Sequence, residues 1–249
     1  AVGKKLTADC AATMKRTSME LGGNAPFIIF GDADIPAAVN GLMASKFRNS
    51  GQTCVCANRI LVQANIYDDF AKALQIATEK LVVGDGMDPQ TTIGPLIHSK
   101  AAHDTQTRLN QALEDGAKIY WPAAIQDYEG SNFVQPVILT DVKEQMSICA
   151  EEIFAPIAPL VRFSDEADAI RLANNTQAGL AAYVYTNDTG QMIRVAESLE
   201  YGMVGINEGI ISNEMAPFGG VKESGNGREG SKYGLDDYLE IKYVCLGGL

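Results

Sequence analysis

The sequence has 249 residues, of which 46% are hydrophobic and 20% charged, and its formal net charge is −11. This length and composition suit a globular protein that buries a core of several elements. The acidic balance argues against a nucleic-acid or anionic-membrane surface, because both need a basic footprint. No apolar run approaches the roughly 20 residues that cross a bilayer, so we expect neither nucleic acid nor membrane as a partner.

The cysteine content and the first residues bear on compartment and completeness. Five cysteines without framework spacing are typical of a reducing compartment, and no signal peptide opens the chain. We expect a cytoplasmic protein, with the mitochondrial matrix as the alternative. Ala1-Val2-Gly3 leads directly into a helix-like run, which indicates a fragment cut inside a βα unit.

Helical and β-rich segments alternate from the start. In chain order, the patterns predict a helix over residues 4–14, strands over 16–21 and 26–30, a helix over 34–49, a strand over 57–63 and a helix over 66–81. In the second of these helices, Asp34 is the expected N-cap, Pro36 is tolerated in the first turn, and Gly51 marks the end.

The alternation continues to residue 207. The patterns predict a helix over residues 99–115, a strand over 117–120, a loop over 121–132, strands over 133–139 and 157–163, a helix over 165–174, a strand over 179–185, a helix over 189–199 and a strand over 203–207. Helices between short strands indicate an α/β fold with a doubly wound, mostly parallel sheet.

The C-terminal part has a different texture. Residues 217–230 are rich in glycine and are expected to form an ordered loop. Residues 238–244 alternate like a strand with one solvated face, and a terminal strand of this kind must pair with another segment. We therefore expect a C-terminal oligomerisation strand, and a homodimer or homotetramer when the protein is full length.

Cys54 follows the Gly51 turn and precedes a predicted strand. A cysteine in a turn can be exposed and have its thiolate stabilised by backbone N–H groups, although a structural cysteine is the commoner case. The two histidines, His98 and His103, lie five residues apart and so on different faces of a helix. This disfavours a Cys–His thiol hydrolase and leaves too few ligands for zinc, so no metal is expected.

Glu20 lies at the end of a predicted strand, immediately before Leu21, Gly22 and Gly23. Two glycines after a strand allow a sharp turn or the close approach of a ligand. A carboxylate at a strand end suits a cleft. A surface glutamate is the alternative interpretation of this segment alone.

The two segments together match the two signature motifs of the aldehyde dehydrogenase superfamily, at the family's usual separation: Glu20-Leu21-Gly22-Gly23 and Gly51-Gln52-Thr53-Cys54. The resemblance continues through residues 94–96, 151–156 and 217–225 and covers essentially the whole chain. Within that superfamily, residues 45–56, 209–213 and 238–245 are similar to the succinate-semialdehyde dehydrogenase group.

The resemblance implies a reaction and its residues. Cys54 is the nucleophile that adds to the aldehyde carbon, a hydride leaves for NAD or NADP, and Glu20 activates the water that hydrolyses the resulting thioester. Arg48 and Ser212 bind the distal carboxylate of a small anionic aldehyde, a task that suits a planar bidentate donor. The implied activity is oxidation of succinate semialdehyde to succinate.

The resemblance also implies which residues hold the cofactor. Glu152 matches the position that holds the nicotinamide ribose, and Phe154 the one that packs the nicotinamide ring. Gly3 lies where the phosphate-binding segment ends, and Leu21 is the fourth cofactor residue that we expect. Residues 153 and 155 depart from the threonine and glycine that are common in relatives.

Cys56 is a candidate redox switch. Residues i and i+2 of an extended chain stand about 6.6 Å apart, close to the upper limit of about 6.8 Å for disulfide-bonded Cα atoms. A Cys54–Cys56 disulfide therefore needs local bending. Some relatives share the pair, so by resemblance its oxidation would switch the enzyme off; a small strand residue without such a role is the alternative.

The resemblance predicts four parts of the chain. Residues 1–21 are the tail of a truncated cofactor-binding domain, 22–223 the catalytic domain, 224–238 a return to the cofactor domain, and 239–249 the oligomerisation strand. Most dinucleotide contacts lie upstream, so we expect little turnover from this fragment alone. Three alternatives stay open: a broader-specificity aldehyde dehydrogenase, a cofactor-independent thiol esterase and a non-catalytic binding protein.

Overall fold

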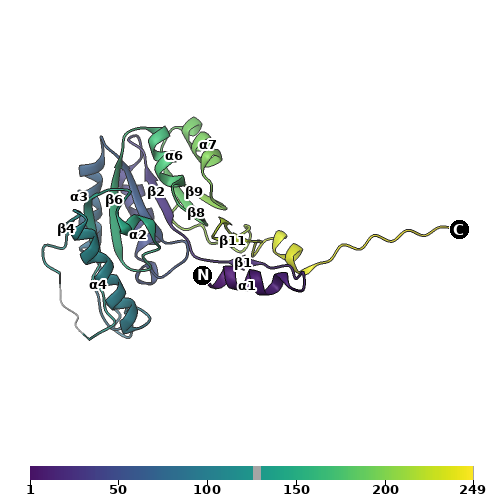
Figure 1. Ribbon diagram of the computed structural model, residues 1–249. Helices are drawn as coiled ribbons and strands as arrows, with labels where there is room; N and C mark the ends of the chain where they lie inside the picture. The colour runs from purple at the N-terminus through teal and green to yellow at the C-terminus, as the bar shows by residue number, and fades with distance from the viewer. Residues whose placement is uncertain (126–129, 249) are drawn as a thin grey trace.

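A central sheet organises the protein. The computed structural model describes residues 1–125 and 130–248 (Figure 1). Within those residues, a seven-stranded sheet has the order β4-β5-β6-β3-β2-β8-β9, and only the edge strand β4 runs antiparallel to its neighbour. In chain order, the strands are β2 (Ala25–Ile29), β3 (Ala57–Gln63), β4 (Lys118–Trp121), β5 (Val137–Val142), β6 (Ile157–Phe163), β8 (Ala181–Tyr185) and β9 (Met203–Ile206).

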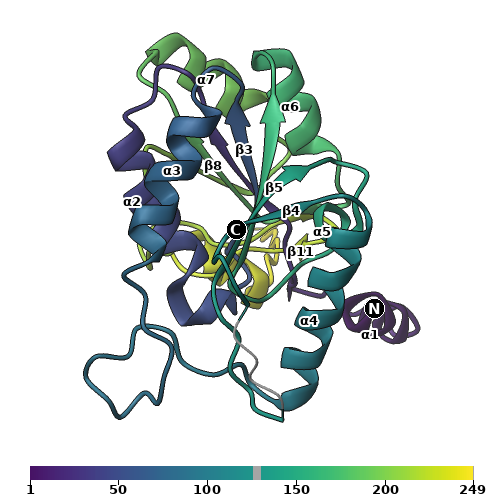
Figure 2. The ribbon, with the colours of Figure 1, turned by 90° about the vertical axis from the view of Figure 1, so that its left-hand side faces the viewer.

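Helices cover both faces of the sheet. Figure 2 shows α2 and α3 on one side and α4 and α6 on the other. The buried side chains form two clusters accordingly, one under α2 and α3 and one under α4 to α7. The bounds are α2 (Ile35–Lys46), α3 (Tyr67–Thr78), α4 (Ser99–Glu114), α5 (Ser147–Ala150), α6 (Glu166–Asn174) and α7 (Thr189–Ser198). The predicted doubly wound, mostly parallel sheet is confirmed.

The central strands are mostly apolar because both of their faces are covered. In β2, Phe27 and Ile29 enter the cluster under α2 and α3. Ile28, which alternates with them, and Phe30 enter the opposite cluster. Asp34 caps α2 as predicted, since its Oδ1 accepts a hydrogen bond from the Ala37 amide at 3.0 Å.

Residues from the two ends of the chain meet beside the sheet (Figure 1). Here α1 (Val2–Ala11) leads to β1 (Met19–Glu20), which pairs antiparallel with β11 (Gly225–Asn226). The short helix η2 (Tyr233–Tyr238) follows β11. A second small ladder joins two more short strands, β7 (Ala178–Gly179) and β10 (Val221–Lys222).

Several predicted boundaries are wrong. The helix expected over residues 34–49 ends at Lys46, because Asn49 and Ser50 have φ angles of 51° and 57° inside the short segment η1 (Arg48–Gly51). The strand expected over 16–21 is reduced to β1, and the one expected over 133–139 begins at Val137. Residues 126–129 of the predicted loop lie outside the described residues.

The predicted C-terminal strand is not formed in the single chain. Residues 239–248 have no assigned strand, and Figure 1 shows them running away from the rest of the molecule. A strand needs a partner for its backbone N–H and C=O groups, and no described segment pairs with this one. Leu249 lies outside the described residues. In the described part of the chain, no helix is long and apolar enough to cross a membrane.

Candidate active site

Cys54 lies on a turn between α2 and β3 that hydrogen bonds to a neighbouring loop stabilise. Three consecutive residues with positive φ, ending at Gly51 with φ 78°, reverse the chain after the helix. The Ser50 hydroxyl donates to the Gly94 carbonyl at 2.8 Å, and Gln52 Oε1 accepts from the Ile97 amide at 2.9 Å. The loop at residues 94–97 therefore holds the turn that carries the cysteine.

Gly23 brings the two sequence motifs together. A Cβ on Gly23 would lie 2.6 Å from the carbonyl oxygen of Cys54, so only a glycine allows this contact. Because β2 and β3 are parallel neighbours that begin at Ala25 and Ala57, the segments before them meet at the amino-terminal edge of the sheet. Glu20 lies at the carboxyl end of β1, as predicted, but β1 pairs with β11 and is not part of the seven-stranded sheet.

The Glu20 backbone is fixed by β11 and by a buried serine. Glu20 pairs with Gly225, and the Leu21 amide donates to the Ser224 carbonyl at 3.1 Å. The Ser224 hydroxyl, with an exposed fraction of 0%, donates to the Gly22 carbonyl at 2.7 Å and accepts from the Gly179 amide at 2.9 Å. Ser224 therefore ties the Glu20 segment to β7.

Glu20 carries an unsatisfied acceptor. Its Oε1 is buried and has no hydrogen-bond partner within the described residues. Burial raises the pKa of the Glu20 carboxyl, and the negative charges of Glu229 and Glu152 raise it further. A desolvated carboxylate with a free acceptor oxygen is suited to take a proton from water.

Cys54 is a protonated thiol at neutral pH. Burial is the main cause that raises its pKa to about 11, and the charge of Glu20 is the next. The backbone N–H groups of Cys54 and Val55 act in the opposite direction but are outweighed. The backbone donors that the sequence suggested therefore do favour the thiolate, but burial and the charge of Glu20 outweigh them, and the nucleophile needs a base.

The loop with Glu152 and Phe154 packs against Gly22 and Gly23. The Gly23 amide donates to Glu152 Oε1 at 3.0 Å, and a Cβ on Gly22 would lie 2.6 Å from Glu152 Oε2. Burial raises the pKa of the Glu152 carboxyl. Phe154 has a φ angle of 54° and an exposed fraction of 43%, so its ring is open to a ligand. Arg108 holds the loop through the Glu152 carbonyl at 2.6 Å.

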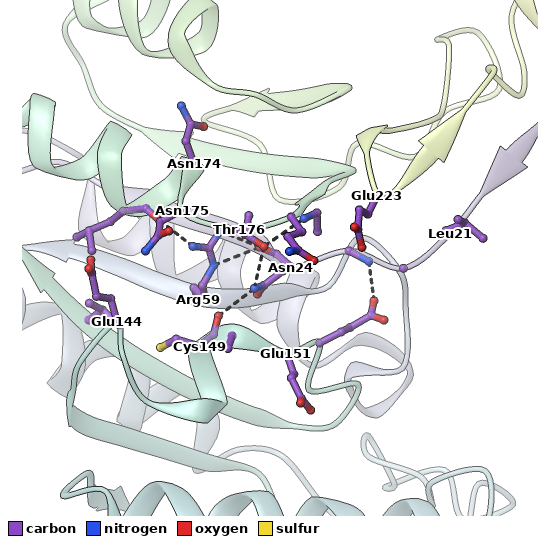
Figure 3. A pocket seen from close by; sticks show the side chains of 18 of the residues that line it. Leu21, Asn24, Arg59, Glu144, Cys149, Glu151, Asn174, Asn175, Thr176 and Glu223 are labelled. Carbon is purple, nitrogen blue, oxygen red and sulfur yellow. Dashed lines mark hydrogen bonds between the residues drawn. The ribbon is translucent and has the colours of Figure 1, made fainter. Parts of the chain in front are cut away.

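A pocket of about 1380 Å³ lies on the Glu152 side of the glycine pair (Figure 3). Gly3, Leu21 and Glu152 line it, and Gly3 is buried against the Leu21 side chain. These residues fit one end of a dinucleotide, since a carboxylate can accept hydrogen bonds from ribose hydroxyls and glycine lets a ligand approach closely. Cys54 and Phe154 are not part of its lining.

Arg48 and Ser212 lie on segments that border the same apolar cluster as Cys54. Both side chains are exposed. Phe47, which precedes Arg48, belongs to that cluster, and Cys54 and Ile211 pack against it. Within the described residues, the exposed Arg48 guanidinium forms no ion pair or hydrogen bond, so it can bind an anion.

The sequence interpretation missed a buried polar layer beneath the site. Asn58 donates to Asn24 Oδ1 at 2.7 Å and to the Glu151 carbonyl at 2.8 Å, and its Oδ1 accepts from the Ile153 amide at 2.9 Å. The adjacent Arg59 is 4% exposed and bonds to several carbonyls. An Asn-Arg pair at the start of an otherwise apolar strand was the available signal, because buried polar groups need partners.

Comparison with known proteins agrees with this geometry. The model of the aldehyde dehydrogenase family matches residues 1–244. A mitochondrial succinate-semialdehyde dehydrogenase of Arabidopsis thaliana is 58% identical over 100% of this chain and 47% of its own length. The NADP(+) succinate-semialdehyde dehydrogenase of Escherichia coli is 57% identical over 99% and 51%. A glutarate-semialdehyde dehydrogenase of Pseudomonas putida is 54% identical over 98% and 50%.

Solved structures give the same result. An NADP-dependent enzyme of Escherichia coli superposes with a TM-score of 0.96 at 57% identity, covering 99% of this chain and 51% of the other. The NAD+ complex of an aldehyde dehydrogenase from Bacillus cereus has a TM-score of 0.91 at 37% identity, with coverages of 97% and 49%. The chain spans about half the length of the curated relatives it matches. It belongs to the aldehyde dehydrogenase family.

Proposed function

We propose that this chain is the catalytic portion of an NAD- or NADP-dependent enzyme that oxidises succinate semialdehyde to succinate. The observation that carries the proposal is the close approach of Gly23, three residues after Glu20, to the carbonyl oxygen of Cys54; the charge of the Glu20 carboxylate also helps to raise the pKa of the Cys54 thiol. A soft nucleophile beside a desolvated carboxylate can form a thioester and then hydrolyse it.

The chain's own residues supply the acyl-transfer chemistry. Cys54 loses its proton to Glu20, directly or through a water, and its sulfur bonds to the aldehyde carbon. The backbone N–H groups at Cys54 and Val55 are donors close to the sulfur, where the oxyanion develops. Glu152 and Phe154 would hold the nicotinamide of NAD or NADP, which would supply the hydride acceptor for this oxidation. Glu20 passes the proton from Cys54 to solvent and then takes a proton from a second water, whose hydroxide attacks the thioester carbonyl. The C–S bond breaks, the carboxylic acid is released, and the departing Cys54 thiolate recovers a proton from Glu20.

Arg48 supports an anionic substrate. Its guanidinium is exposed and lies on the segment that carries Cys54. Relatives above 50% identity are named for succinate and glutarate semialdehydes, which both carry a carboxylate at the far end. Arg48 would bind that carboxylate in a bidentate fashion and Ser212 would add one hydrogen bond.

Glu152, Phe154, Gly3 and Leu21 are the residues of this chain that would hold the nicotinamide end of the cofactor. The contacts of residues 1–21 with residues 224–238 support assigning both to one cofactor-binding unit beside a catalytic domain of residues 22–223. Residues 239–249 would pair with another copy in a homodimer or homotetramer. A mitochondrial matrix or cytoplasmic setting suits the free cysteines and the names of the relatives.

The test is made on the complete enzyme that contains this chain. NAD(P)H formation is followed with succinate semialdehyde and with an uncharged aldehyde of similar length, for wild type, Cys54→Ser and the matched control Cys10→Ser. Cys10 lies in α1 and is only half-buried, so that variant should keep its activity while Cys54→Ser loses it. Absence of NAD(P)H formation in the wild type, or full activity in Cys54→Ser, would reject the proposal.

A further inference from the structure

Lys46 and Cys56 form a buried pair that the proposed chemistry does not use. Lys46 is the last residue of α2 and has an exposed fraction of 0%; Cys56 stands just before β3 and is 6% exposed. Lys46 Nζ lies 3.5 Å from Cys56 Sγ. Among the described residues, Cys56 Sγ is the hydrogen-bond acceptor for Lys46 Nζ.

The Lys46 nitrogen and the Cys56 sulfur are close enough to react with each other, because 3.5 Å separates them. Burial lowers the pKa of the Lys46 amine and raises the pKa of the Cys56 thiol, and the attraction between their charged forms opposes both shifts without reversing them. The direction of the Lys46 shift favours the neutral amine, which has a free lone pair and is a nucleophile. The structure therefore places an amine nitrogen directly beside a thiol sulfur.

Cys56 is directed toward α2. Besides Nζ, its Sγ contacts the Lys46 carbonyl at 3.6 Å and the Ala57 carbonyl at 3.5 Å. The pKa of Cys54, by contrast, is raised by the charge of Glu20. The Cys56 sulfur thus has the lysine nitrogen as its close neighbour, and this differs from the Cys54–Cys56 pairing that the sequence suggested.

We propose that Lys46 and Cys56 are a covalent modification site, where oxidation of the thiol by a peroxide ends in a direct S–N bond between the two side chains. The peroxide first oxidises the sulfur: Cys–SH + H₂O₂ gives Cys–SOH + H₂O. The amine then attacks that sulfur: Cys–SOH + Lys–NH₂ gives Cys–S–NH–Lys + H₂O. Sulfenic acids condense with nitrogen in this way, and thiols reverse the product.

The S–N bond would restrict the turn that carries Cys54. Residues 46 and 56 flank Arg48 and Cys54, and the loop between them holds the three positive-φ residues at 49–51. A covalent tie between its ends restricts the loop. This proposal does not depend on the proposed dehydrogenase activity, because its readout is a peptide mass.

Peptide mapping separates the two pairings. The chain is treated with hydrogen peroxide, its free thiols are blocked, and it is digested with trypsin without reductant. Cleavage sites at Lys46, Arg48 and Arg59 put Cys54 and Cys56 in one peptide, residues 49–59. An S–N bond blocks cleavage at Lys46 and links residues 17–48 to residues 49–59, with a net loss of about two hydrogen masses.

The expected result is this linked pair in wild type and in Cys54→Ser, its reversal by dithiothreitol, and its absence in Lys46→Met and Cys56→Ser. Circular dichroism checks that the variants fold, and the wild-type map decides the question even if they do not. A loss of two hydrogens inside residues 49–59, with normal cleavage at Lys46, identifies a disulfide and overturns the proposal. A linkage that retains an oxygen atom, or oxidised Cys56 without any linkage, also overturns it.

Discussion

Gly23 lies against the carbonyl oxygen of Cys54, with room for a hydrogen atom but not for a methyl group. This contact joins the segment that carries the carboxylate to the one that carries the sulfur, across the neighbouring strands β2 and β3. The two motifs are separate in sequence, and the shape of one glycine allows their backbones to touch.

Substituting Gly23 by alanine should damage both stability and catalysis. The new Cβ would lie 2.6 Å from a backbone oxygen, and relieving that overlap should cost about 1–3 kcal/mol. Urea denaturation measures the loss. Gly86→Ala is the matched control, because nothing lies within 4 Å of its Cβ. Equal midpoints for the two variants would show that the close approach is unimportant.

Alkylation of Cys54 should be slow at neutral pH and rise steeply with pH. Since its pKa is raised to about 11, the reactive thiolate increases about tenfold per pH unit below that value. Glu20→Gln removes a negative charge, lowers the pKa and should accelerate labelling by iodoacetamide. Glu229→Gln is the control, because Glu229 acts on Glu20 and is not among the groups that shift Cys54. A rate independent of pH between 7 and 10 would contradict the protonated thiol.

Arg48→Gln should raise KM for succinate semialdehyde by about 10- to 100-fold in the complete enzyme, since a charge-assisted hydrogen bond contributes about 1.5–3 kcal/mol. An uncharged aldehyde should be affected little. Arg48→Lys keeps the charge but loses the planar guanidinium, so its KM should lie between those of the wild type and Arg48→Gln. Steady-state kinetics with both substrates tests this; an equal loss on both would exclude a carboxylate-binding role.

Arg59→Met should destabilise the protein by about 3 kcal/mol or more. The substitution leaves the carbonyls of Asn24, Leu172 and Ala173 without their donor in a buried site. Lys100→Met, on the exposed face of α4 with one ion pair to an aspartate, should change stability by less than about 1 kcal/mol. Comparable urea midpoints for these two variants would refute the role of the buried layer.

Removing residues 239–249 should reduce the size of the assembly without reducing the stability of the fold. Within residues 239–248, Arg16 contacts Leu239 and Glu240, whereas apolar side chains such as Ile241 and Val244 are exposed. We expect the urea midpoint to stay nearly constant, while light scattering on the complete enzyme shows a smaller assembly than the wild type. An unchanged molar mass would argue against the oligomerisation strand.

The alternation of strands and helices could be predicted because it depends on local patterns. In β2, an unbroken apolar run follows from burial on both faces, and the Asp34 cap follows from a short-range hydrogen bond. The boundaries at Lys46 and Val137 could not be predicted, because they depend on contacts with distant segments. The same holds for residues 239–248, whose alternation requires a partner strand that no segment in the described part of the chain supplies.

The chemical groups of the site can be read from the sequence alone: a thiol, a carboxylate, and the glycines that let their segments approach each other. Their pKa values depend on how the chain packs. Burial raises the pKa of Cys54 and of Cys56 and lowers that of Lys46, and burial is a property of the packed fold. Desolvation and charge depend on what surrounds a group in space, and most of those surroundings come from residues far away in the chain.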